Sequence, residues 1–151
     1  MNFRADGAGG RSDGMAHPRV VTTPTASEFI ERKRQECLGE HPKEYRFKDI
    51  SRKGHRIWRL EARTLMPQSD YPEKVFMVER LRYVRDEGAP PPWGPEYDPC
   101  QYRIGYFIVA QVGRRRGNWW WGQYCPIIPS RDLYRLLRKA EKEGTILKEN
   151  S

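Results

Sequence analysis

The 151-residue sequence contains no apolar run that approaches a membrane span, which needs about 20 consecutive apolar residues. The N-terminal stretch, MNFRADGAGGRSDGM, also lacks the apolar core of a signal peptide. These two absences predict a cytoplasmic protein without a membrane partner. Translation can begin at Met1 or at Met15, and the sequence does not distinguish between them.

Cysteine and histidine are scarce and widely spaced. The three cysteines and three histidines show no CxxC, CxxH or HxxxH spacing, whereas zinc ligands usually occur in close pairs. We therefore expect no metal site and no cofactor. An odd number of cysteines in a cytoplasmic chain also indicates reduced thiols.

The common catalytic motifs are missing as well. The sequence has no glycine-rich phosphate loop, no nucleophile elbow and no HExxH pair. An enzyme would need scattered polar residues, such as His55, Glu61, Asp98 and Cys100, to meet in the fold. The sequence leaves enzymatic activity uncertain and favours a protein that is not an enzyme.

Positive charge is what the sequence has in excess. The formal net charge is +8, and arginine supplies 20 of the 28 basic residues. Arginine contacts phosphate in a planar, bidentate manner and stacks on aromatic rings, so this excess favours a polyanionic partner. A GC-rich coding sequence would give the same excess without functional meaning. Residues 102–128 hold four basic residues and no acidic one.

The most aromatic stretch, residues 102–129, is predicted to form a β-hairpin. β-branched and aromatic residues occupy nearly every position of Tyr102–Val112, which is typical of a strand. Arg114–Gly117 then forms the loop, in which Gly117 can adopt a positive φ. The second strand begins near Trp119.

Two sides of this hairpin follow from its predicted register. Pairing Val112 with Trp119 and Ala110 with Trp121 places these four residues on the core side. The opposite side then contains Phe107, Val109, Gln111, Trp120 and Tyr124. That second side is either an exposed binding surface or is covered by a helix or the N-terminal segment. The tendency of large aromatic rings to be buried favours coverage.

A helix is predicted over Thr25–Leu38, near the start of the domain. Thr25 and Glu28 have the spacing of a capping box, and Gly39 can end the helix. Its apolar stripe is thin, which indicates a helix that lies on a surface.

Two antiparallel strands are predicted to follow, over residues 45–48 and 57–66. In the second strand, alternate residues from Trp58 to Met66 would face the core, and the residues between them would face solvent. A basic patch would then contain Arg52, Lys53, Arg56, Arg59 and Arg63.

Residues 75–84, VFMVERLRYV, fit two interpretations. Pro72 and Glu73 are typical of a helix start, and Met77, Leu81 and neighbouring apolar residues would share one helical face. The abundance of Val, Phe and Tyr and the alternation of apolar positions favour a strand.

A long loop is predicted over residues 86–101, which contain five prolines. Loops of this length are often docking arms or lids, and they are also often plain insertions. Trp93 is its candidate for partner contact.

The C-terminal helix has the clearest pattern. Pro129 and Ser130 precede it, Asp132 lies in its first turn and Gly144 ends it. Its apolar stripe consists of Leu133, Leu136, Leu137 and Ala140. The other face is basic.

Together these patterns predict an α+β fold in a single domain over residues 25–147. An antiparallel sheet of four to five strands carries the capped C-terminal helix on one face and is accompanied by a shorter N-terminal helix. Residues 1–24 are predicted to be a disordered tail, and residues 148–151 a C-terminal tail. The sequence does not predict an oligomeric state.

The favoured function is nucleic-acid association without sequence specificity, because no helix-turn-helix, zinc-finger, KH or RNP signature is present. The candidate nucleic-acid contacts are Arg114, Arg115, Arg116, Trp120, Arg135, Arg138, Lys139 and Lys142. The alternative is a protein-interaction or accessory module. Its candidate contacts are Trp93, Phe107 and Tyr124.

Overall fold

The computed structural model describes residues 22–37, 39, 41–49, 53–89 and 98–148. The predictions for residues 1–21, Arg52 and Trp93 lie outside this part of the chain. The described elements are, in order, α1 (Ala26–Gln35), β1 (Glu44–Asp49), β2 (Gly54–Gln68), β3 (Tyr71–Gly88), β4 (Cys100–Val109), the 3-10 turn η1 (Gly113–Arg115), β5 (Trp119–Trp121) and α2 (Ser130–Lys142).

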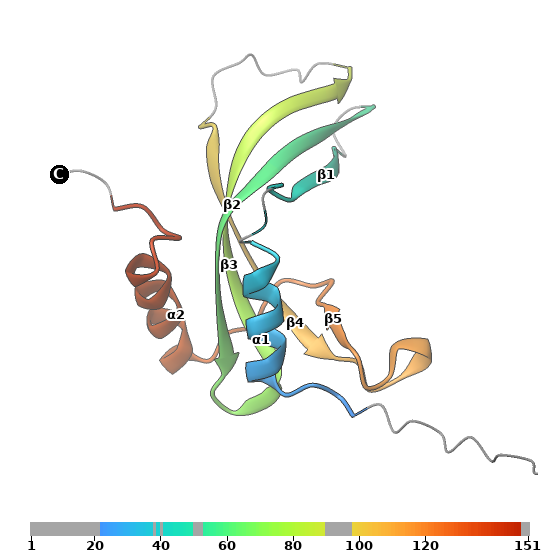
Figure 1. Cartoon of the computed structure of the whole chain (residues 1–151), viewed down its shortest axis with the longest axis vertical. Helices are drawn as coiled ribbons and strands as arrows, with labels where there is room; N and C mark the ends of the chain where they lie inside the picture. Colours follow the sequence, from blue (N-terminus) through green and yellow to red (C-terminus); the bar gives the residue numbers. More distant parts are fainter. Residues whose placement is uncertain (1–21, 38, 40, 50–52, 90–97, 149–151) are drawn as a thin grey trace, which may run out of the picture.

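The five strands form one antiparallel sheet in which each strand pairs with the next along the chain, in the order β1-β2-β3-β4-β5. The prediction of an α+β fold with four to five antiparallel strands is therefore confirmed. Residues 75–84 lie within β3, so the interpretation of this segment as a strand is also confirmed. β2 and β3 are long and curl strongly (Figure 1).

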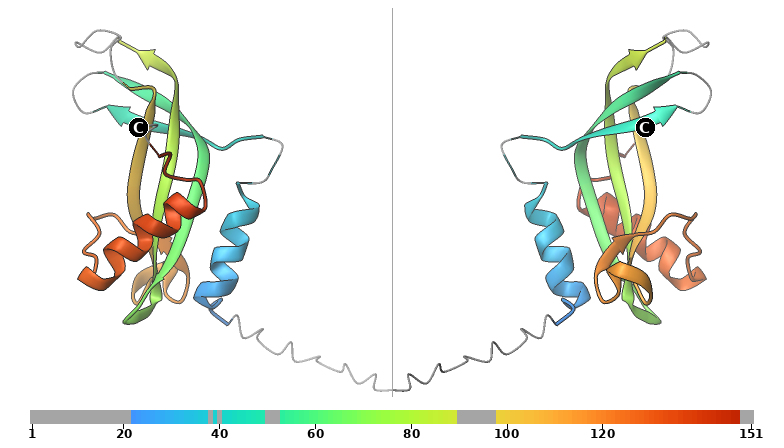
Figure 2. Two further views of the ribbon diagram at one scale, coloured as in Figure 1. Left: turned by 90° about the vertical axis from the view of Figure 1, so that its left-hand side faces the viewer. Right: turned by 90° about the vertical axis from the view of Figure 1, so that its right-hand side faces the viewer.

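The two helices cover opposite faces of the half of the sheet that lies near the β2–β3 turn (Figures 1 and 2). On one face, here called the α1 side, α1 packs against Leu65, Val75 and Met77. On the other, the α2 side, Leu136 and Ala140 of α2 pack against Met66, Phe76 and Val78. Because successive residues of a strand point to opposite faces, coverage on both sides explains the unbroken apolar run of β3.

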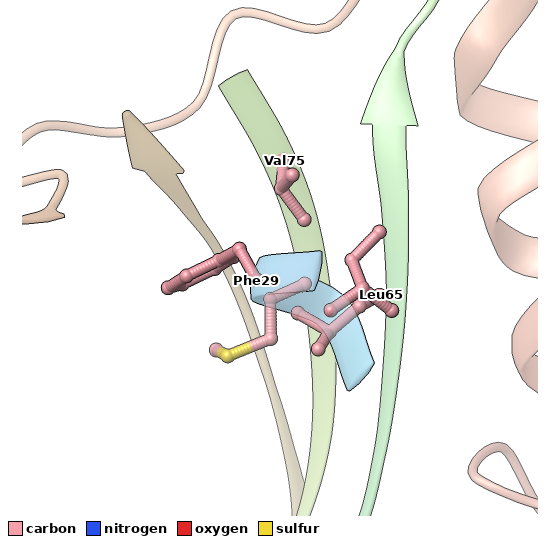
Figure 3. Packing of buried hydrophobic residues seen from close by; sticks show 5 residues of the cluster. Phe29, Leu65 and Val75 are labelled. Carbon is pink, nitrogen blue, oxygen red and sulfur yellow. The ribbon is translucent and has the colours of Figure 1, made fainter. Parts of the chain in front are cut away.

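The capping box predicted at the start of α1 is present. The Glu28 amide donates to the Thr25 hydroxyl, and the Thr25 amide donates to the Glu28 carboxylate at 2.7 Å. The helix ends at Gln35, earlier than predicted. Figure 3 shows Phe29 of α1 beside Leu65 and Val75 of the sheet, so the thin apolar stripe of α1 is sufficient to cover this face.

The end of α2 is fixed to the sheet by a glycine cap. Gly144 has a φ of 72°, and the Thr145 amide donates to the Ala140 carbonyl at 2.8 Å. The Thr145 hydroxyl is hydrogen-bonded to that of Thr64 in β2. The predicted stripe is correct for Leu136 and Ala140, but Leu133 lies at the margin and is 38% exposed.

A β-bulge at Glu61 overturns the predicted alternation of β2. Leu60 pairs with Leu81 and Ala62 pairs with Arg80, so Glu61 is an extra residue between the two pairs. An extra residue exchanges the two faces of the strand beyond it. Trp58 and Leu60 therefore lie on one side of the sheet, and Thr64 and Met66 lie on the other.

The predicted register between β4 and β5 is also wrong. Val109 pairs with Trp119 and Phe107 pairs with Trp121, three residues away from the predicted pairing. An odd shift exchanges the two sides of the hairpin. Trp119 and Trp121 accordingly share the α1 side with Phe107, whereas Trp120 pairs with Ile108 on the α2 side. Since helices cover both sides, the apolar pattern alone could not select the register.

Candidate functional site

The hairpin tip, residues 110–118, carries the three consecutive arginines Arg114, Arg115 and Arg116. The glycines that flank them, Gly113 and Gly117, have φ values of 74° and 77°, which confirms the positive φ predicted for Gly117. The Gly117 amide donates to the Ala110 carbonyl at 2.8 Å and closes the loop. All three arginines are exposed, and the tip extends away from the sheet (Figure 1).

The three tryptophans of β5 have different surroundings. The Trp119 ring stacks on Phe29, with ring centroids 4.5 Å apart, and its Nε1 donates to the Pro24 carbonyl at 2.7 Å. Trp121 packs edge-on against Phe107 at 5.2 Å. Trp120, which points to the other side of the strand, is 39% exposed.

Arg115 and Trp120, which the sequence analysis assigned to one nucleic-acid surface, meet in the fold. The Arg115 guanidinium lies over the Trp120 indole, with its Cζ 3.2 Å from the ring centroid. A guanidinium placed over an indole is attracted by the negative face of the ring. The tip therefore has a flat aromatic and cationic platform beside two further arginines.

The charge of the tip is not neutralised by the described part of the chain. No carboxylate among the described residues forms an ion pair with Arg114, Arg115 or Arg116, and none lies within residues 102–128. Several surface arginines elsewhere are paired with carboxylates. These pairs include Arg46–Glu87, Arg59–Glu44, Arg82–Glu61 and Arg85–Glu44.

The basic face of α2 lies far from this tip: in Figure 1 α2 is at the left of the sheet and the tip extends to the right, beyond β5. Two of its four candidate residues have acidic neighbours. Arg135 is 3.6 Å from the Asp132 carboxylate, and Lys139 pairs with Glu143. Arg138 and Lys142 form no ion pair with the described residues and are exposed. The structure thus separates the eight candidate nucleic-acid contacts into two regions.

The candidate partner contacts do not form one surface. Phe107 is half-buried on the α1 side, where Phe29 packs against its ring at 5.0 Å. Tyr124 is 81% exposed in the segment between β5 and α2. Trp93 lies outside the described residues. The exposed aromatic face proposed for Phe107, Trp120 and Tyr124 is therefore divided, because Phe107 and Trp120 are on different sides of the sheet.

A buried charge cluster on the α1 side was missed by the sequence analysis. It consists of Tyr45, Arg63, Glu79 and Arg103, one from each of the first four strands. Glu79 is fully buried and accepts hydrogen bonds from the Tyr45 hydroxyl and Arg63 Nε, both at 2.8 Å, and from Arg103 Nε at 2.9 Å. The side chain of Arg63, predicted to face solvent, is only 2% exposed.

The reversal of Arg63 is a consequence of the bulge in β2, which turns this residue towards Glu79. The only sequence signal for the cluster is Glu79 itself, a single acidic residue within an apolar strand. Arg103 completes the cluster by stacking over Tyr45 and Trp121, with its Cζ 4.4 and 4.7 Å from the two ring centroids.

Several pKa values in and near the cluster are shifted by its environment. Burial, and then the charge of Glu79, raise the pKa of Tyr45 to about 12. Burial lowers the pKa of the Arg63 guanidinium, but the Glu79 carboxylate, together with Tyr45 and Cys37, offsets this effect, so that the pKa is raised overall. Burial also raises the pKa of the nearby Cys37 thiol. The charged groups of the cluster satisfy one another's hydrogen-bonding capacity, which is typical of a structural cluster and not of a reactive one.

The described residues form no other cluster of metal-ligating or potentially catalytic side chains. Within them, no group of three or more His, Cys, Asp or Glu side chains is arranged to hold a metal ion. Glu61 and His55 line separate hollows of about 420 and 410 Å³ and do not meet in one site. No helix among these residues is both long and apolar enough to cross a membrane.

Comparison with protein-family models, with curated proteins and with solved structures found no match to this chain. A function for this protein must therefore be inferred from the residues described above. Among them, the hairpin tip is the region where charge, exposure and an aromatic platform coincide.

Proposed function

We propose that this protein associates with nucleic acid without sequence specificity and that the hairpin tip is its main contact. The observation that carries the proposal is the cluster of three exposed, un-neutralised arginines beside the half-exposed ring of Trp120. Arginine forms bidentate contacts with phosphate oxygens, and aromatic rings stack on bases.

The expected affinity comes mainly from counterion release. Each phosphate that an arginine neutralises frees condensed cations, so binding weakens as salt increases. Contacts with phosphates position a protein on nucleic acid but do not read its sequence. A tip with three consecutive exposed arginines fits this mode.

The basic face of α2 is a second contact in this proposal. Arg138 and Lys142 supply positive charge that is not paired with any described carboxylate, whereas Arg135 and Lys139 form ion pairs with Asp132 and Glu143. Because α2 lies far from the tip (Figure 1), only a strand long enough to span the distance between them contacts both.

The test is a salt titration of binding to labelled single-stranded and double-stranded oligonucleotides, from about 50 to 200 mM. The triple variant R114A/R115A/R116A should bind more weakly and reduce the slope of log K against log salt by about two. The matched control, R59A/R82A/R85A, removes the same charge from arginines that already have carboxylate partners. Absence of binding at about 50 mM salt removes the proposal.

A protein-docking role is the second candidate. It is supported by Tyr124 and Ile127, which are 81% and 85% exposed in the segment that joins β5 to α2. A contiguous exposed apolar patch is typical of a contact surface, and these two side chains are the candidates for one. Substitution of both by serine should leave oligonucleotide binding unchanged if the two roles use separate surfaces.

A further inference from the structure

The ring of Trp120 is held in place before any ligand binds. Its neighbours in β5 are both anchored on the α1 side, Trp119 by Phe29 and by the Pro24 carbonyl and Trp121 by Phe107. Alternation along the strand then directs Trp120 to the opposite side, where it pairs with Ile108. A ring that is already oriented loses little conformational entropy when it binds.

Arg115 extends this platform. Its guanidinium lies over the Trp120 indole, 3.2 Å from the ring centroid. A planar guanidinium placed over a ring still has a second face for stacking and in-plane N–H groups for phosphate oxygens. Arg114 and Arg116 are exposed on either side of it along the chain. The site therefore offers flat surfaces for stacking, with positive charge next to them.

This combination distinguishes between two forms of nucleic acid. In a duplex the faces of the bases are covered by neighbouring base pairs, so a surface platform meets only phosphates and groove edges. An unpaired base exposes its π face and can stack on an aromatic ring or on an arginine plane. We infer that the Arg115–Trp120 platform binds an unpaired base, so that the preferred ligand is single-stranded nucleic acid. This inference rests on the proposed function and deepens it.

The experiment compares one 12-nucleotide sequence as a single strand and as a blunt duplex, at the same salt, by fluorescence anisotropy. The wild-type protein should bind the single strand at least about tenfold more tightly. Trp120→Ala should weaken single-strand binding by about 5- to 100-fold and change duplex binding by less than about twofold. Arg115→Lys keeps the charge but loses the planar stack, so it should reduce the same preference.

Two further measurements keep the outcomes distinct. Thermal unfolding of each variant checks its fold. If Trp120→Ala does not fold, the single variants Arg115→Lys and Trp120→Phe replace it in the comparison of strand and duplex. Failure of both oligonucleotides to bind removes the proposed function and this inference together. Equal wild-type affinity for strand and duplex overturns the inference alone, and so does an equal loss for both ligands in Arg115→Lys.

Discussion

Glu79 connects the first four strands through one carboxylate. Tyr45 of β1, Arg63 of β2 and Arg103 of β4 all donate hydrogen bonds to it, and it is fully buried in β3. A buried carboxylate is costly unless its oxygens are satisfied and its charge is balanced. Here two guanidinium groups and a phenol meet both requirements, so the cluster depends on Glu79 more than on any of its partners.

We predict that Glu79→Gln destabilises the protein by about 3–5 kcal/mol, because it leaves the buried Arg63 with only the partly exposed Glu36, at 3.4 Å, as a counter-charge. Glu61→Gln is the matched control, since Glu61 also binds two arginines, Arg80 and Arg82, but is partly exposed. That substitution should cost less than about 1 kcal/mol. Urea unfolding of both variants measures the difference, and equal losses would show that burial of the cluster contributes nothing.

Tyr45 should make stability depend on pH in the alkaline range. Burial and the Glu79 charge raise its pKa to about 12 in the folded protein, against about 10 for an unperturbed tyrosine. Between these values the unfolded chain loses the proton and the folded chain keeps it, so the free energy of unfolding falls as pH rises. The stabilising contribution is complete below about pH 10 and is lost through about pH 12.

The measurement is the free energy of unfolding at several pH values between about 8 and 11 for the wild type and for Tyr45→Phe. The variant loses the hydroxyl that bonds Glu79 and is less stable at neutral pH, but its stability should decline less steeply above about pH 10. Parallel curves for the two proteins would contradict this account of Tyr45.

At the scale of elements, β5 is positioned by a close fit between a glycine and a ring. The Trp121 ring occupies the space where a Cβ at Gly105 would lie. Phe107 and Arg103 pack against the same ring, so it cannot easily move aside. This contact helps to set the observed register, which in turn directs Trp120 towards Arg115.

We predict that Gly105→Ala lowers the free energy of unfolding by about 1–3 kcal/mol, because the added methyl group overpacks this contact. Gly39→Ala is the control, since nothing lies within 4 Å of a Cβ at that position. It should change stability by less than about 0.5 kcal/mol. Thermal or urea unfolding compares the two, and a neutral Gly105→Ala would mean that the Trp121 ring moves freely.

The elements themselves could be predicted from the sequence, but the side each strand presents could not. Thr25 and Glu28 predicted the start of α1, and Gly144 predicted the end of α2, because capping depends on residues close together in the chain. The bulge at Glu61 and the register of β5 depend on contacts between distant residues. These errors explain why Arg63 was predicted to face solvent and why Phe107 was predicted to share one side of the hairpin with Trp120.

At the scale of the whole molecule, acidic and basic residues are distributed unevenly. Carboxylates of β1, β2 and β3 form ion pairs with arginines of these three strands, as in Arg46–Glu87 between β1 and β3 and Arg82–Glu61 between β3 and β2. The stretch from β4 to the start of α2 has no acidic residue between positions 102 and 128. The excess positive charge of the chain, +8 in total, is therefore concentrated at the hairpin tip and on α2, which lie far apart (Figure 1).

This distribution predicts that strand length decides which basic region matters. A short oligonucleotide of about ten nucleotides covers one site on the surface of a protein of this size. Substitution of Arg114–Arg116 should weaken its binding, whereas R138A/K142A on α2 should change it by less than about twofold. A strand several times longer can pass from the tip to α2, so both variants should weaken its binding.

Competition binding with the two lengths measures this dependence, with R82A/R85A as the control that removes the same charge as R138A/K142A. The control arginines have carboxylate partners, so their loss should affect neither length strongly. If R138A/K142A weakens the short strand while substitution of Arg114–Arg116 does not, α2 is the primary contact. The un-neutralised charge of the tip would then not be what attracts nucleic acid, because the two regions lie too far apart for a short strand to contact both.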